Sequence, residues 1–247
     1  MVRQVQRRSV GSNGVQRKRR RRRSVKRWQR DLPFTARGGR RPGAGRPRGR
    51  TSVPHVTRAK LSPSYPVQIT MKLRAGLPSL RRKHAYQALL GAFYAGGDRF
   101  GFRLNQYSVQ SNHLHLIVEA TDRTALTRGM QGLTIRIAKA LNRTWGRKGK
   151  VFRERYHDRI LRSPRQVRNA LRYVLNNVRK HSAGFKPGTI DTCSSGAWFT
   201  GWRESFELTR IERTIARPVA RAKTWLLHTG WLKYHPPISV NEAPARP

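Results

Sequence analysis

The stretch FRLNQYSVQSNHLHLIVE, residues 102–119, contains the pattern that decides the fold. Residues 102–109 and 113–119 are both typical of β-strands, and the polar residues 110–112 between them predict a tight turn. Two strands joined by so short a connection pair with each other as an antiparallel hairpin. The sequence therefore places a hairpin at the centre of the domain.

The second of these strands carries two histidines, His113 and His115, two positions apart. Successive side chains of a strand point to opposite faces, so both imidazoles lie on one face while Leu114 and Leu116 point into the core. A lone histidine would be an ordinary polar residue. Two imidazoles on one face of an otherwise apolar strand indicate a two-ligand metal site.

Further elements flank the hairpin, and connections between them are short. A strand and a helix precede it and a helix, a strand and a third helix follow it; we expect them at residues 67–73, 79–94, 124–145, 157–161 and 164–181. Strand, helix, hairpin, helix, strand is a split βαβ pattern. The predicted class is α+β: a four-stranded antiparallel sheet with helices packed on one face, as in ferredoxin-like and RRM-like domains.

This domain spans residues 63–185, and the sequence on either side has a different texture. Residues 1–62 are rich in Arg, Gly, Ser and Pro and have too few apolar residues to order themselves, which predicts a disordered basic arm. Within it, residues 45–50 resemble an AT-hook, so Arg46 and Arg48 are candidate minor-groove contacts; a solvated linker fits equally well. The fold of residues 186–247 stays open.

The charge of the chain points to a polyanionic partner. The 54 Lys and Arg residues against 11 Asp and Glu leave a formal charge of +43, and neutralising phosphates releases counterions from nucleic acid. A run of about 18 apolar residues, which a membrane span needs, is not found, so no membrane partner is expected. Cys193 is the only cysteine, which excludes an intrachain disulfide and fits a reducing cell interior.

The helix expected at residues 164–181 carries two further candidates. Its apolar stripe at helical spacing places Tyr173 and Asn177 together on one shoulder, one turn apart, beside the sheet. Asn176 faces away from the stripe. Spacing alone also fits Tyr173 as a half-buried aromatic at a helix–sheet boundary.

Several charged residues are candidates for supporting roles. Glu119 shares the histidine face, where it either orients His115 or pairs with a nearby arginine. Arg168 and Arg172 lie on the other shoulder of the tyrosine helix, where they either hold phosphates or are solvated. A basic loop flanked by aromatic residues is suited to contacts with unpaired bases; its cations are Arg147, Lys148, Lys150, Arg153 and Arg155.

Taken together, these motifs resemble the single-tyrosine HUH transposases, especially the REP-associated tyrosine transposases of bacteria. The resemblance rests on residues 108–116, 155–157 and 172–177 and extends through 194–198 to 224–227. His-Leu-His alone is a weak signal, whereas His-Leu-His followed by a helix with Tyr-x-x-x-Asn is a strong one. The family commonly has Asn-Pro where this chain has Asn177-Val178.

The resemblance implies a site and a reaction. A divalent metal, Mg or Mn, is held by His113, His115 and Asn177, and Tyr173 attacks a phosphate of single-stranded DNA near a hairpin. The attack leaves a 5′-phosphotyrosine and a free 3′-hydroxyl, so the enzyme is an endonuclease and strand transferase. It also implies a bacterial cytoplasmic protein associated with the nucleoid, working as a monomer or a homodimer.

Two alternatives stay open. A domesticated protein would bind nucleic acid and keep the fold without cutting. A replication initiator or relaxase would use related chemistry, but those proteins commonly carry a helicase or another order of motifs, and no nucleotide-binding loop is found here.

Overall fold

The computed structural model describes residues 58–181, 185–205 and 216–244. These residues all fall within one compact unit, Gly49–Pro247. The predicted basic arm, apart from residues 58–62, lies outside the described residues, as do the candidate contacts Arg46 and Arg48.

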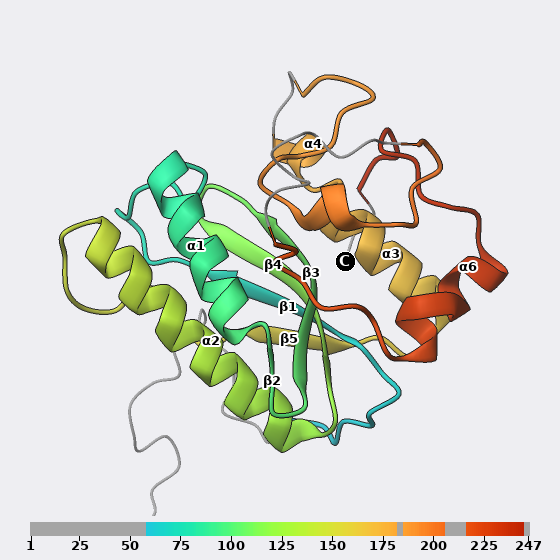
Figure 1. Cartoon of the computed structure of the whole chain (residues 1–247), viewed down its shortest axis with the longest axis horizontal. Helices are drawn as coiled ribbons and strands as arrows, with labels where there is room; N and C mark the ends of the chain where they lie inside the picture. The colour runs from blue at the N-terminus through green and yellow to red at the C-terminus, as the bar shows by residue number, and fades with distance from the viewer. Residues whose placement is uncertain (1–57, 182–184, 206–215, 245–247) are drawn as a thin grey trace, which may run out of the picture. The chain divides into compact units, whose positions relative to one another are not determined.

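The described chain forms an antiparallel sheet flanked by helices (Figure 1). Its strand order is β2-β3-β4-β1-β5. The strands are β1 (Val67–Lys72), β2 (Asp98–Arg99), β3 (Phe102–Val109), β4 (His113–Ala120) and β5 (His157–Ile160). The helices are α1 (Lys83–Gly96), α2 (Arg123–Thr144), α3 (Pro164–Leu175), α4 (Val178–His181), the 3₁₀ turn η1 (Ser195–Trp198), the π-helical turn η2 (Leu226–Gly230) and α6 (Trp231–Tyr234).

The predicted α+β class and antiparallel sheet are confirmed, but the sheet has five strands instead of four. The extra strand, β2, arises because the chain reverses sharply at Phe100 and Gly101, whose φ angles are 50° and 79°. Two consecutive left-handed residues make the kind of turn that joins adjacent antiparallel strands. The chain therefore pairs β2 with the start of β3 before continuing along it.

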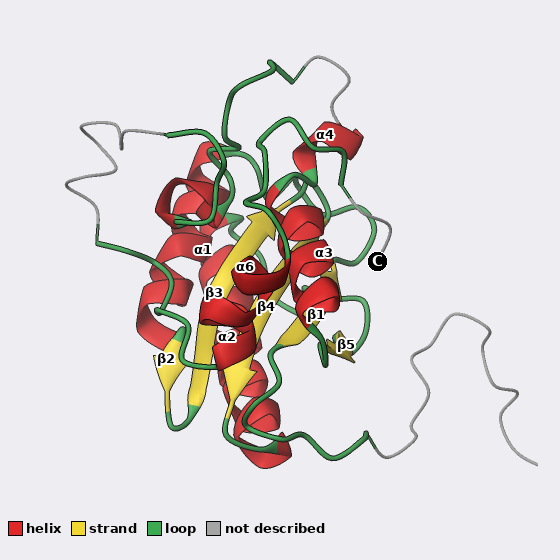
Figure 2. Cartoon of the chain, turned by 90° about the vertical axis from the view of Figure 1, so that its right-hand side faces the viewer, coloured by secondary structure: helices red, strands yellow, loops and turns green. Residues whose placement is uncertain are grey.

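Helices cover both faces of the sheet, which corrects the expectation of one covered face. Figure 1 shows α1 and α2 on one side, and Figure 2 shows α3 and α6 over the other. The residue responsible is Ile117, which lies on the histidine face and is fully buried with Val167 and Val174 of α3. It interrupts the alternation of β4, so the strand is apolar on both faces at that point.

The third helix is shorter than the sequence predicts. It begins as expected, because the Ser163 hydroxyl accepts a hydrogen bond from the Gln166 amide at 3.3 Å and caps the first turn. It ends at Leu175, and Asn176 leaves the helical conformation before the short helix α4 begins. The break falls between Tyr173 and Asn177, so local turn geometry sets their relation.

The described C-terminal residues pack against α3. Their apolar side chains join those of α3 in one cluster on the histidine face of the sheet; they are Leu226, Leu227, Trp231 and Ile238.

No described helix has the length and apolar character needed to cross a membrane.

Two glycines of α2 give opposite predictions for the same substitution. A Cβ at Gly129 would stand 2.5 Å from the Cβ of Phe102, whereas one at Gly132 would meet only the end of the flexible Arg136 side chain. Replacing glycine with alanine in a helix stabilises it by about 1 kcal/mol, but overpacking costs about 1–3 kcal/mol. We expect Gly129→Ala to lower the free energy of unfolding by about 1–2 kcal/mol and Gly132→Ala to raise it slightly. Urea titration of both variants measures the difference, and equal effects would contradict this packing.

Candidate active site

The two predicted histidines lie on one face of β4, as the alternation of the strand requires. Their rings are 4.7 Å apart between centroids and meet edge to face. The neighbouring strand β1 places Thr70 opposite His115, and the Thr70 hydroxyl lies 3.1 Å from His115 Nδ1. Because this contact fixes the ring, Nε2 is the nitrogen of His115 that faces α3.

Tyr173 reaches this nitrogen from the opposite element. Its hydroxyl oxygen lies 3.5 Å from His115 Nε2, and the two rings meet edge to face with centroids 4.9 Å apart. The tyrosine side chain is only 8% exposed. The structure therefore brings together His113, His115 and Tyr173, which the sequence separates by about 60 positions.

Asn177, the third predicted metal ligand, is an unusual buried polar residue just after the end of α3. It is 0% exposed, and neither Oδ1 nor Nδ2 has a hydrogen-bond partner in the described part of the chain. Leaving a buried amide unpaired costs about 1–3 kcal/mol. The adjacent Asn176 differs, since its Nδ2 donates to the carbonyls of Ser239 and Glu242. A buried amide without a partner is what a ligand-binding side chain would leave in a ligand-free structure.

The donor set suits a divalent cation only if the asparagine takes part. No group of three His, Cys, Asp or Glu residues able to hold a metal is found within residues 58–181, 185–205 and 216–244. Two imidazole nitrogens and one amide oxygen leave coordination positions for phosphate or water. Mn²⁺ and Mg²⁺ accept oxygen ligands, and imidazole favours the transition metal.

Glu119 does not extend this site. Its buried carboxylate forms an ion pair with Arg103 at 3.1 Å and accepts hydrogen bonds from the backbone amides of Lys223 and Thr224. The side chain that contacts His115 Nδ1 is Thr70 instead. Of the two roles considered for Glu119, the structure shows pairing with an arginine, and it adds the anchoring of the C-terminal segment.

The predicted basic loop lies at the histidine end of the sheet. The Arg153 amide donates to the Lys72 carbonyl at 2.9 Å, and Lys72 is the register partner of His113. Arg147 is folded back, since its guanidinium donates to Asn142 Oδ1 at 2.7 Å. Four other cations of the loop are exposed; they are Lys148, Lys150, Arg153 and Arg155.

Arg168 and Arg172 make contacts within the protein that the sequence did not predict. Both form ion pairs with Glu242, at 2.9 and 3.3 Å, and Arg168 also donates to the Pro236 carbonyl. Further along the chain, Arg179 donates to the Val240 carbonyl. This row of side chains fastens the C-terminal segment to α3. Sequence spacing could not show that a carboxylate 70 positions away occupies them.

This clamp should depend on pH. Burial acts to raise the pKa of Glu242, but hydrogen bonds from the Ser239 amide and from Arg168 outweigh it and hold the pKa below its ordinary value. A lowered folded-state pKa stabilises the fold above the unfolded pKa of about 4.3, and the contribution disappears as the pH falls through the folded value.

We therefore expect Glu242→Gln to lower the free energy of unfolding by about 1 kcal/mol at pH 7. The variant and the parent should converge in acid, below about pH 4. Urea unfolding at neutral and acid pH measures this. A difference that stays constant across the range would show that the charge of Glu242 is not involved.

The sheet register brings four further residues to the histidine face, and sequence reasoning missed three of them: Thr70, Lys72 and Arg159. Thr70 and Lys72 of β1 pair with His115 and His113. On the outer strand β5, His157 and Arg159 pair with β1 and share this face. The alternation of side chains along β1 shows that Thr70 and Lys72 share one face. Sequence spacing does not show which strand lies beside β4.

Comparison with known proteins matches a family model and several solved structures. Residues 65–177 match the family model described as Transposase IS200 like. The solved structure of a REP-associated tyrosine transposase bound to a REP hairpin is similar at a TM-score of 0.43 and 19% identity, covering 53% of this chain and 75% of that chain. Comparison with curated proteins gave no match. The matched family segment contains both histidines, Tyr173 and Asn177.

Proposed function

We propose that this chain, whose residues 65–177 match the family model described as Transposase IS200 like, cuts and joins single-stranded DNA with Tyr173 as nucleophile. The observation that carries the proposal is the 3.5 Å approach of the Tyr173 hydroxyl to His115 Nε2. The attacking hydroxyl belongs to α3 and the two histidines belong to β4, and the hydroxyl approaches the histidine face at His115. The nucleophile and its activating site therefore share one location.

His113, His115 and Asn177 would hold a divalent metal, Mn²⁺ or Mg²⁺. The unpaired buried amide of Asn177 supports this assignment, because binding through Oδ1 gives that oxygen its missing partner. When bound, such a cation polarises a phosphate oxygen and stabilises the charge that develops on it. Thr70 would orient His115 through Nδ1, with Nε2 facing Tyr173.

The reaction conserves the phosphate ester. The Tyr173 oxygen forms a bond to phosphorus, the bond from phosphorus to the 3′-oxygen breaks, and the released 3′-oxygen takes up a proton in place of the one that tyrosine loses. A phosphotyrosine at the 5′ end and a free 3′-hydroxyl remain. Because the ester is retained, another 3′-hydroxyl can reverse the step on a different strand without a nucleotide cofactor.

The basic loop would hold the strand near this point. Lys72 and Arg153 lie at the histidine end of the sheet, where a backbone phosphate needs positive charge. The family resemblance extends the proposal to substrates in which a hairpin lies beside the cleavage site. It does not fix the DNA sequence.

The test is to incubate the full chain with labelled single-stranded DNA hairpins from the flanks of its own gene, with Mn²⁺, with Mg²⁺ and with EDTA. We expect a metal-dependent adduct that survives denaturation, with the DNA attached to the peptide that contains Tyr173. DNA binding without an adduct on any of these substrates would support the domesticated, non-cutting alternative instead.

A further inference from the structure

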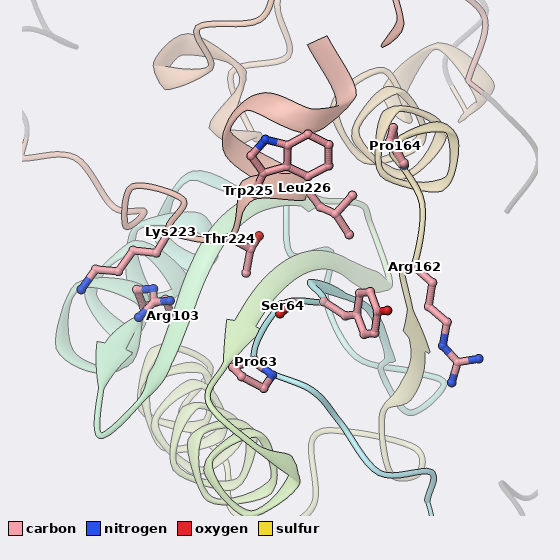
Figure 3. Close-up of a pocket in the computed structure, with 10 residues that line it drawn as sticks. Pro63, Ser64, Arg103, Arg162, Pro164, Lys223, Thr224, Trp225 and Leu226 are labelled. Carbon is pink, nitrogen blue, oxygen red and sulfur yellow. The ribbon is translucent and has the colours of Figure 1, made fainter. Parts of the chain in front are cut away.

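A pocket lies on the histidine face of the sheet, away from Tyr173. It has a volume of about 640 Å³, within the range of pockets that bind small ligands. Figure 3 shows Trp225 on one wall with Pro63 and Ser64 across from it, Arg103 and Lys223 towards one end and Arg162 at the other. Aromatic surface between cations is the combination that binds unpaired nucleotides.

Trp225 is held as a platform. The Trp225 ring packs so closely over Gly230 that a Cβ on this glycine would stand 2.6 Å from the ring. The Tyr234 ring meets the indole edge to face, with 6.3 Å between the ring centroids. Even so, the side chain is 52% exposed. Trp225 immediately precedes the π-helical turn η2, a distortion that occurs frequently at functional sites. One face of the indole is thus fixed by the protein while other surface stays open to a ligand.

The cations of the pocket differ in their availability. Arg103 is already paired with the buried Glu119 carboxylate, which also accepts the Lys223 backbone amide and so positions that residue. The charged ends of Lys223 and Arg162 form no ion pair with any residue that the structure describes, and both side chains are exposed. Two cations therefore remain to meet a phosphate.

The edge strand β5 connects this pocket to the proposed active site. His157 is the register partner of Thr70, the residue that contacts His115, and Arg159 follows on the same face. Arg162 of the pocket comes directly after this strand. Five residues of extended chain from His157 to Arg162 cover about 16 Å, a span that a few nucleotides bridge.

We propose that this pocket binds one nucleotide of the single-stranded DNA that flanks the attacked phosphate. Its base stacks on Trp225, and Lys223 and Arg162 hold its phosphates, with Arg159 contacting the strand on the way. The position of this nucleotide relative to the cleavage point rests on the proposed function, whereas the stacking of a base on Trp225 is independent of it.

Binding is measured by fluorescence anisotropy with labelled oligothymidine in EDTA, with Tyr173→Phe as the parent so that no cutting occurs. We expect Trp225→Ala to weaken binding about five- to a hundredfold and Trp225→Phe to retain most of it. Phe100→Ala is the matched control, because Phe100 is an exposed aromatic, 87% accessible, on the β2–β3 turn; its affinity should not change. Equal binding by Trp225→Ala and its parent would overturn the proposal.

The charge contacts have a separate readout. Lys223→Gln and Arg162→Gln should each reduce the slope of log affinity against log salt by about 0.7, the value for one phosphate contact with a single strand. Lys139→Gln, an exposed cation on α2, should leave the slope unchanged. Unchanged slopes in the pocket variants would overturn the phosphate contacts even if Trp225→Ala were misfolded.

Photochemical cross-linking locates the base. An oligothymidine with one 5-iododeoxyuridine should cross-link to the peptide that contains Trp225, and cross-links only to other peptides would overturn the assignment. The two proposals fail in different ways. Trp225-dependent binding without any tyrosine adduct refutes the proposed cutting but keeps the subsite, whereas an adduct without such binding refutes only the subsite.

Discussion

Replacing Tyr173 with phenylalanine is expected to abolish the covalent protein–DNA adduct and strand transfer while fold and DNA binding persist. The substitution removes only the hydroxyl, whose contact with His115 Nε2 is long, at 3.5 Å, so the loss of stability should stay within about 1 kcal/mol. Loss of a covalent nucleophile lowers turnover by about 10⁴-fold or more. Denaturing gels with labelled hairpin DNA and Mn²⁺ measure the adduct, and thermal unfolding measures the fold.

Tyr94→Phe is the control for this experiment. Tyr94 is an exposed tyrosine of α1, on the side of the sheet away from the histidines, so its replacement should leave the adduct at full yield. Persistence of the adduct in Tyr173→Phe, with the DNA mapped to another tyrosine, would reject the assigned nucleophile. A misfolded Tyr173→Phe protein would be recognised by its melting curve and by loss of binding.

The local part of the fold is predictable from the sequence because it depends on side-chain alternation and on signals at element ends. The hairpin at residues 102–119 and the capped start of α3 at Ser163 follow from such patterns. The break after Leu175 does not, because the apolar spacing continues through it. There the buried side chain of Asn176 bonds to the carbonyls of Ser239 and Glu242, more than 60 positions away.

The candidate site divides along the same line. The orientation of His113 and His115 follows from strand periodicity, and helix periodicity places Tyr173 on the side of α3 that faces the sheet. The partners of these residues depend on strand pairing. Thr70 meets His115 across 45 positions, and the carboxylate of Glu119 is taken by a backbone segment 104 positions away. Spacing within one element carries no information about such contacts.

Asn177 gives the second large effect, because stability and metal binding should change in opposite directions. Its amide is buried and has no partner among the described residues, so Asn177→Leu, similar in size, should raise the free energy of unfolding without metal by about 1–3 kcal/mol. Asn176→Leu is the matched control next to it. That variant loses two hydrogen bonds to carbonyls and should lose stability by a similar amount.

Metal binding is read from melting temperature, since an ion that binds only the folded chain stabilises it by about 2.7 kcal/mol at a hundred times its dissociation constant. Mn²⁺ should raise the melting temperature of the parent and of Asn176→Leu, and should have little effect on Asn177→Leu or on a variant with both histidines replaced by alanine. Asn177→Asp should be less stable than the parent without metal, because it buries an unpaired charge, and should gain more from Mn²⁺ because a carboxylate binds the cation more strongly. If Asn177→Leu keeps the full response to Mn²⁺, its oxygen is not a ligand, and the unpaired amide must then have another cause.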